Sequence, residues 1–137
     1  MSVSWRSVLV ACAVVAQAAM AGTATPTVAV PQRGEQIYQR CIACHAIDRN
    51  RTGPQHCGLF GRRAGTAPGF ADYSQAMRAS GTIWNERTLD VFLQAPTKAV
   101  PGTSMGYDGL KIPQERADLI AWLRQAAKPG KACTVSR

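Results

Sequence analysis

The feature that most constrains this chain is the pentapeptide Cys41-Ile42-Ala43-Cys44-His45. Two thiols separated by two residues and followed directly by an imidazole form the C-x-x-C-H pattern, which attaches haem to a polypeptide. The thiols add across the two vinyl groups of haem to give thioethers, and the adjacent histidine offers a ring nitrogen to the iron. We therefore expect one covalently bound haem c per chain, attached to Cys41 and Cys44 and ligated by His45. Such a group fills the middle of a fold and relieves the limited core of a 137-residue chain.

Two other uses of paired cysteines fit this sequence poorly. A structural zinc site needs four ligands, usually with a second pair at metal spacing. The remaining candidates are only His56, Cys57 and the distant Cys133. A thioredoxin-like dithiol needs a βαβ setting, and no run of this sequence alternates with the period of two that is typical of strands.

The start of the chain has the layout of an export signal. Arg6 precedes an apolar run over residues 8–19, and Ala19-Met20-Ala21 then offers small residues at the two positions that a signal peptidase reads. We expect residues 1–21 to be a signal peptide that is cut before Gly22, and the protein to reside in the periplasm.

Two alternatives for this segment stay open. The apolar run is shorter than the ~20 residues that span a bilayer, so an uncleaved anchor is disfavoured and no permanent membrane span is expected. Cys12 ends a short box that resembles a lipoprotein cleavage site. After the signal, residues 22–30 are rich in Thr, Ala and Pro and are expected to be a flexible lead-in, and residues 31–137 form one domain.

Charge and cysteine count add to this interpretation. The chain has 16 Lys and Arg against 8 Asp and Glu, a net charge of +8. Export and the scattered basic residues argue against nucleic acid, and the charge instead favours acidic protein surfaces. Cys57 and Cys133 lie outside the C-x-x-C-H motif, and two such cysteines in an oxidising compartment are expected to form a disulfide. The alternative is a buried Cys57 that packs as a small apolar residue.

The rest of the sequence predicts helices joined by long loops. Helix formers fill 32–40, a short helix is expected within 73–80, and Asn85 can cap a helix over 86–94 that stops before a proline. A last helix starts at Pro113 and carries an apolar stripe. The stretches between them, including 95–110, are irregular. Loops of this length make sense in a compact domain if they wrap a large ligand, so the fold class is all-α.

A sixth iron ligand must come from outside the pentapeptide. A soft thioether holds haem iron at a higher potential than a second histidine does. Met105 lies in an irregular stretch that can deliver it to the haem. Met77 falls in the expected short helix, where core packing is the simpler role, and His56 is a competing ligand if its loop turns inward.

From Gly34 to Lys128 the chain resembles the class I c-type cytochromes of the mitochondrial type, and specifically their soluble bacterial relatives. Six segments carry the resemblance in order: Cys41 to His45, Thr52-Gly53-Pro54, Gly58-Leu59-Phe60-Gly61-Arg62, Ala67-Pro68-Gly69-Phe70, Pro101-Gly102-Thr103 with Met105, and Glu115-Arg116-Ala117-Asp118-Leu119-Ile120-Ala121. The resemblance implies a cytochrome c fold, in which the terminal helices cross and long loops wrap around one covalently bound haem.

The resemblance also implies roles for individual residues. Met105 matches the family's axial methionine, and Pro54 matches the residue whose carbonyl accepts the ring N–H of His45. Four positions match the groups that bury and hydrogen-bond the haem propionates: Arg62, Tyr73, Trp84 and Thr103. The family docks its partners through a ring of lysines around the haem edge, and this chain can supply Arg40, Arg51, Lys98 and Lys111. It departs from the family at Phe92, where a tyrosine is usual, and at His56, where an apolar residue is usual.

The function implied is that of a soluble, monomeric single-electron carrier and not an enzyme. Its expected partners are redox proteins such as a cytochrome bc complex of a respiratory chain, a terminal oxidase, a photosynthetic reaction centre or a dehydrogenase. Two alternatives remain. One is a haem protein with a labile sixth ligand that acts as a peroxidase or gas sensor. The other is a dedicated electron acceptor of one dehydrogenase.

Overall fold

The computed structural model describes residues 28–130 and residue 133, and the expected signal peptide lies outside them. Five helices follow one another along the chain: α1 (Pro31–Tyr38), α2 (Gln75–Ala79), α3 (Glu86–Gln94), α4 (Pro96–Ala99) and α5 (Pro113–Ala126). Within the described residues there is no strand, only isolated bridges between Arg63 and Ile83 and between Gly130 and Cys133. The predicted all-α class is therefore confirmed.

The helix starts follow from local chemistry. The Asn85 side chain accepts a hydrogen bond from the Thr88 N–H, and the Thr88 hydroxyl accepts one from the Asn85 N–H, so a capping box opens α3. Pro113 occupies the first turn of α5, where its missing N–H costs nothing. Both starts agree with the sequence prediction.

One helix was not predicted. The stretch 95–110 was expected to be irregular, but α4 forms a single turn over Pro96–Ala99. A proline ends the helix before it, yet its fixed φ also suits the first turn of a new helix. In this stretch both effects operate, so α3 ends and α4 begins at the same proline.

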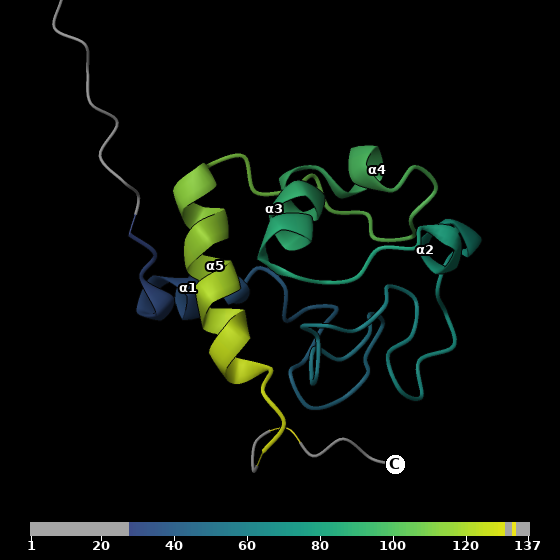
Figure 1. Cartoon of the computed structure of the whole chain (residues 1–137), viewed down its shortest axis with the longest axis horizontal. Coiled ribbons are helices and arrows are strands. Elements are labelled where there is room, and N and C mark those ends of the chain that lie inside the picture. The colour runs from purple at the N-terminus through teal and green to yellow at the C-terminus, as the bar shows by residue number, and fades with distance from the viewer. Residues whose placement is uncertain (1–27, 131–132, 134–137) are drawn as a thin grey trace, which may run out of the picture.

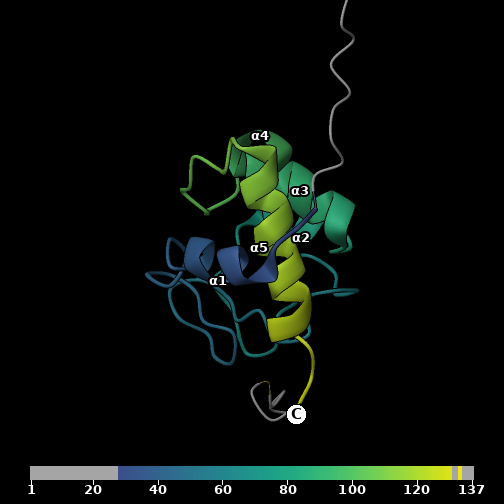
Figure 2. The ribbon, with the colours of Figure 1, turned by 90° about the vertical axis from the view of Figure 1, so that its left-hand side faces the viewer.

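The crossing of α1 over α5 joins the two ends of the described chain (Figures 1 and 2). Gly34 makes this crossing possible: a Cβ at this position would lie 2.6 Å from Trp122 Cβ and 2.7 Å from the Asp118 carbonyl carbon, and it would also clash with the Asp118 carbonyl oxygen. Glycine thus lets one helix backbone rest directly on the other.

Asp118 fastens the start of α1 to α5. Asp118 is 1% exposed. Its carboxylate accepts hydrogen bonds from the Val30 N–H at 2.6 Å, the Arg33 Nε at 2.8 Å and the Gln114 amide at 2.8 Å. Burial alone would raise the pKa of Asp118, but these donors outweigh it and hold that pKa below its usual value.

Arg116 is a second buried polar anchor on α5. Its Nε donates to Asp90 of α3 at 2.6 Å, and its Nη1 donates to the carbonyls of Leu110 at 2.8 Å and Lys111 at 3.3 Å. It therefore ties α3 and the loop before α5 to one side chain.

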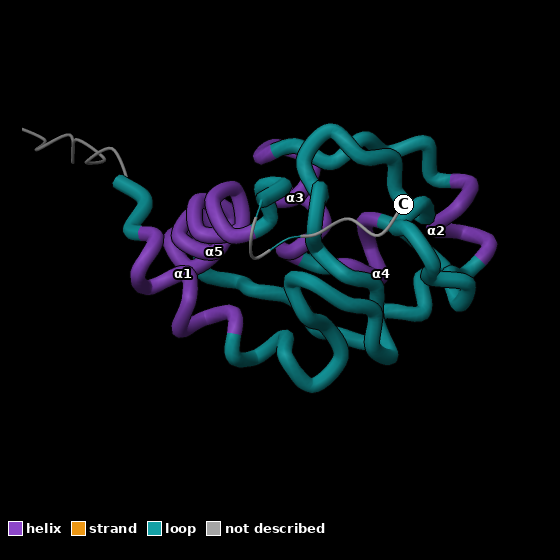
Figure 3. The backbone as a smooth tube through the Cα atoms, turned by 90° about the horizontal axis from the view of Figure 1, so that it is seen from below, coloured by secondary structure: helices purple, strands orange, loops and turns teal. Residues whose placement is uncertain are grey.

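Long loops make up the other side of the molecule, and Figure 3 shows how much of the tube is loop. Within the described residues, no helix is long and apolar enough to cross a membrane. The loops and helices together surround one large cavity.

Candidate functional site

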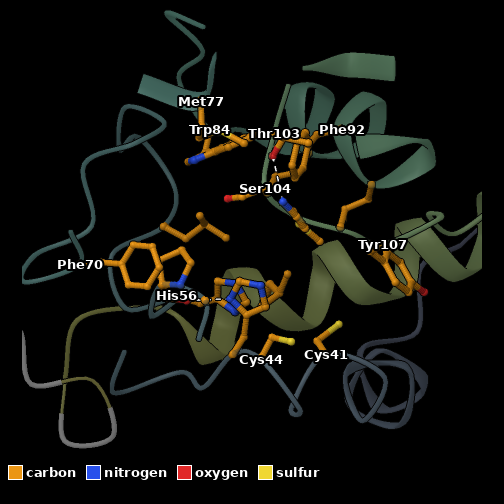
Figure 4. Close-up of a pocket in the computed structure, with 18 of the residues that line it drawn as sticks. Cys41, Cys44, His56, Phe70, Met77, Trp84, Phe92, Thr103, Ser104 and Tyr107 are labelled. Atoms are coloured by element: carbon orange, nitrogen blue, oxygen red, sulfur yellow. Dashed lines mark hydrogen bonds between the residues drawn. The ribbon is translucent and has the colours of Figure 1, made fainter. Parts of the chain in front are cut away.

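A cavity of about 370 Å³ lies between the loops and the inner faces of α3 and α5. This volume falls within the usual range of cofactor sites. All nine residues predicted to hold the cofactor line it: Cys41, Cys44, His45, Pro54, Arg62, Tyr73, Trp84, Thr103 and Met105. Figure 4 shows Cys41 and Cys44 on one wall, with Thr103 and Ser104 across the open space from them. The structure thus brings together residues that are up to 64 positions apart in the sequence, from Cys41 to Met105.

His45 is oriented by its own loop. Its Nδ1 lies 2.8 Å from the Pro54 carbonyl oxygen. Because a carbonyl can only accept, Nδ1 carries the hydrogen and donates, which leaves Nε2 with a free lone pair. Burial lowers the pKa of His45 despite this hydrogen bond, so the ring is neutral and suited to a metal.

Gly53 leaves the space that the His45 ring occupies. A Cβ on Gly53 would lie 2.5 Å from Cε1, 2.8 Å from Nδ1 and 2.9 Å from Nε2 of that ring. Any other residue here would displace the imidazole. The glycine directly before Pro54 is the sequence signal that could have identified this role.

The loop after α4 carries the methionine candidate. Met105 is partly buried and packs against the core, and its N–H donates to the Thr103 hydroxyl at 3.3 Å. Met77 also lines the cavity, but it lies on α2 and is 7% exposed within the hydrophobic core. The packing role suggested for Met77 is consistent with this burial.

Arg62 presents an unsatisfied donor beside the cavity. Its Nη1 donates to the Cys57 carbonyl at 2.6 Å and its Nη2 to the Gln55 carbonyl at 2.9 Å. Its buried Nε has no hydrogen-bond partner among the described residues. A buried guanidinium N–H without an acceptor is costly, and a carboxylate entering the cavity would satisfy it.

Two aromatic residues lie in the same region. The Tyr73 hydroxyl accepts a hydrogen bond from the Ala67 N–H at 3.3 Å, and burial raises the pKa of this phenol. Trp84 is buried against Phe92, with ring centroids 5.1 Å apart. Together with Arg62 they form a mostly apolar wall with a few polar groups, as is typical of cofactor sites.

His56 lies beside His45. The two rings stack with centroids 4.6 Å apart and planes 21° apart, and the Tyr38 hydroxyl lies 3.0 Å from His56 Nδ1. This position is on the His45 wall, so the geometry does not favour His56 as a ligand opposite His45. Burial, then the proximity of His45 and Arg62, lowers the pKa of His56 well below its usual value, so its ring is neutral.

The four predicted docking residues are all exposed, but they differ in their contacts. Arg40 makes two hydrogen bonds to Glu115, both 2.9 Å long. The Lys111 ammonium donates to the carbonyls of Gln94 and Asp108. Arg51 and Lys98 are exposed and make no ion pair among the described residues.

Cys57 and Cys133 lie side by side. Their Cα atoms are 5.3 Å apart and their sulfurs are in contact, and each residue is 2% exposed. This separation lies inside the range that a disulfide requires. Cys41 and Cys44 take no part in a disulfide and line the cavity.

The comparisons with known proteins agree with this geometry. The family model described as cytochrome c matches residues 31–127. Cytochrome c of Sesamum indicum is 48% identical over 97 residues, 68% of this chain and 86% of that protein. Cytochrome c2 of Rhodomicrobium vannielii is 46% identical over 96 residues, 68% of this chain and 76% of that protein. The solved structure of cytochrome cH from Methylobacterium extorquens superposes with a TM-score of 0.68 at 37% identity and covers 70% of this chain and 98% of that one.

The fold and the cavity define a haem-binding class of small helical proteins. The chain belongs to the cytochrome c family. It carries one covalently bound haem c, and the site fits that group: paired thiols beside a neutral imidazole, a glycine cradle, and the unpartnered Nε of Arg62 for a propionate. The protein is thus a monohaem electron carrier with the predicted cytochrome c fold.

Proposed function

We propose that this protein shuttles single electrons in the periplasm between membrane complexes or dehydrogenases, with haem iron ligated by His45 and Met105. The observation that carries the proposal is the neutral His45 ring, with its free Nε2, which lines the same cavity as Cys41 and Cys44. When bound, the haem supplies a one-electron couple.

The side chains of the site would hold this group and limit its chemistry. Cys41 and Cys44 would bond it to the chain, and Pro54 keeps His45 in the tautomer that can ligate. Arg62, Tyr73, Trp84 and Thr103 would bury and hydrogen-bond its carboxylates. If His45 and Met105 both ligate the iron, no position would remain for a substrate at the metal, which favours a carrier over a peroxidase or gas sensor.

The ligand assignment is tested by comparing Met105→Ala with Met77→Ala in the ferric protein. Both residues line the cavity, so each is a control for the other. We expect the wild type and Met77→Ala to show a weak near-infrared sulfur-to-iron band, and Met105→Ala to lose it. Loss of the band in Met77→Ala alone, or its absence in the wild type, would refute the assignment and revive a labile sixth position.

Partner binding is proposed to be electrostatic, through Arg40, Arg51, Lys98 and Lys111. Arg51 and Lys98 should dominate, because Glu115 offsets the charge of Arg40, and carbonyl oxygens hold the ammonium of Lys111. Encounters of this kind weaken as salt shortens the Debye length from about 10 Å at 0.1 M to about 3 Å at 1 M.

The docking proposal is tested by the reduction rate with a bacterial cytochrome bc complex. Arg51→Glu and Lys98→Glu should slow reduction at low salt and flatten its salt dependence. Lys128→Glu makes the same charge change at an exposed residue after the end of α5, outside the proposed docking set, and should have a smaller effect. Equal effects of all three variants would mean that only net charge matters.

The disulfide and the export signal are proposed together, because both depend on the compartment. Alkylation of the unfolded, unreduced haem protein, followed by mass measurement, should find no free thiol if Cys57 and Cys133 are bonded, and two if they are not. The same mass would show a start at Gly22 if residues 1–21 are removed. A lipid on Cys12, or an intact N-terminus, would contradict the signal-peptide interpretation.

A further inference from the structure

The imidazole of His45 is restrained at its edge, but one hydrogen bond does not fix the plane of a ring. Pro54 holds Nδ1, and Gly53 lies over one face of the ring at Cε1, because a Cβ there would be 2.5–2.9 Å from Cε1, Nδ1 and Nε2. These two contacts restrain the ring only on its Nδ1–Cε1 side. A group stacked parallel to the ring would restrain its tilt further.

His56 supplies this parallel contact. Its ring lies 4.6 Å from that of His45, centroid to centroid, and the 21° between the planes makes the pair nearly parallel. A flat ring stacked in this way follows the tilt of its neighbour, whereas a branched aliphatic side chain of similar size would not define a plane.

His56 is itself fixed by a hydrogen bond to the first helix. The Tyr38 hydroxyl lies 3.0 Å from His56 Nδ1, and the Tyr38 ring meets that of His56 edge-on at 5.7 Å. Among the described residues, this is the only side-chain hydrogen bond of His56. The orientation of His56 therefore depends on Tyr38.

Tyr38 has little freedom to move. It is 5% exposed and packs on Trp122 of α5 with ring centroids 4.6 Å apart. The contact lies at the α1–α5 crossing. A chain of contacts thus leads from the helix crossing through Tyr38 and His56 to the ring of His45.

We propose that His56, held by Tyr38, is a positioning residue that sets the plane of the His45 imidazole. The proposal rests on the proposed function, because it takes His45 as the iron ligand. It assigns a role to the position where the chain departs from the family's usual apolar residue.

The test uses the ferric haem protein and the proton NMR signals of the four haem methyl groups, whose spread depends on the plane of the axial imidazole. His56→Leu fills the space without a flat ring or a hydrogen bond, and Tyr38→Phe removes only the hydroxyl. We expect the spread to change in both variants, and more in His56→Leu. Ile120→Val, a buried change in α5 outside the cavity, should weaken the fold by about 1 kcal/mol without changing the spread.

Each outcome decides one question. A wild-type spread in His56→Leu would overturn the proposal, and so would an equal change in Ile120→Val. If His56→Leu fails to fold or to bind haem, an unchanged spread in Tyr38→Phe would overturn it as well. Failure of the proposed function is distinct, because the wild type itself would then lack the spectrum of a histidine–methionine pair.

Discussion

Replacing Gly34 by alanine tests the close crossing of α1 and α5 directly. In a free helix this change is favourable by about 1 kcal/mol, because alanine is the better helix former. At the crossing, however, the new methyl would lie 2.6 Å from Trp122 Cβ and 2.7 Å from the carbonyl carbon of Asp118. Carbon atoms in contact prefer about 3.5–4.0 Å, so the helices would have to separate by roughly 1 Å.

The two effects have opposite signs, and their magnitudes decide the result. Overpacking costs about 1–3 kcal/mol, and the upper end applies here because backbone atoms cannot rotate away. Subtracting the gain in helix propensity leaves a loss of about 2 kcal/mol. For a domain of this size, that loss lowers Tm by about 8–16 °C.

The assay is denaturant unfolding of the ferric haem protein, followed by far-ultraviolet circular dichroism. Gly130→Ala is the matched control, because a Cβ at Gly130 meets none of the described residues within 4 Å, and it should change the unfolding free energy by less than about 0.5 kcal/mol. If Gly34→Ala is as stable as the wild type or more stable, the gain in helix propensity exceeds the cost of overpacking, and the two helix backbones are not in contact.

Three further predictions concern polar anchors. Hydrogen bonds hold the pKa of Asp118 below its usual value, so its carboxylate stabilises the fold fully above about pH 4 and less as the pH falls through the lower, folded-state pKa. In urea titrations, Asp118→Asn should therefore have a smaller unfolding free energy than the wild type at pH 7, and should lose less of it on acidification. Arg116→Ala leaves loop carbonyls unsatisfied and should cost about 3 kcal/mol in the same assay, whereas Asp90→Asn, whose side chain is 46% exposed, should cost about 1 kcal/mol or less. Arg40→Gln removes an exposed pair with Glu115 and should cost less than about 1 kcal/mol, and a larger loss would show that this pair is structural.

The sequence predicted the parts of this structure that depend on local chemistry. The cap at Asn85 and the proline at 113 marked two helix starts correctly, because a cap is made by neighbours in the chain. The C-x-x-C-H motif located the cavity wall for the same reason. The turn of α4 was missed, since Pro96 was considered only as a stop.

The contacts that were not predicted join residues distant in the chain. Nothing near His56 in the sequence indicates that it stacks on His45 or meets Tyr38, 18 residues earlier. The pairing of Arg40 with Glu115 spans 75 positions, so the number of available docking charges could not be counted from the sequence.

The crossing of α1 and α5 determines when, during synthesis of the chain, the cavity can close around its cofactor. A ribosome makes α1 and the pentapeptide after it early, but α5 begins only at Pro113, 68 residues after His45. Until those last turns exist, α1 has no surface on which to pack, and an isolated helix of 8 residues is unstable in water. The two thiols and the imidazole therefore stay accessible through most of synthesis, and the cavity can close around its cofactor only when the end of the chain arrives.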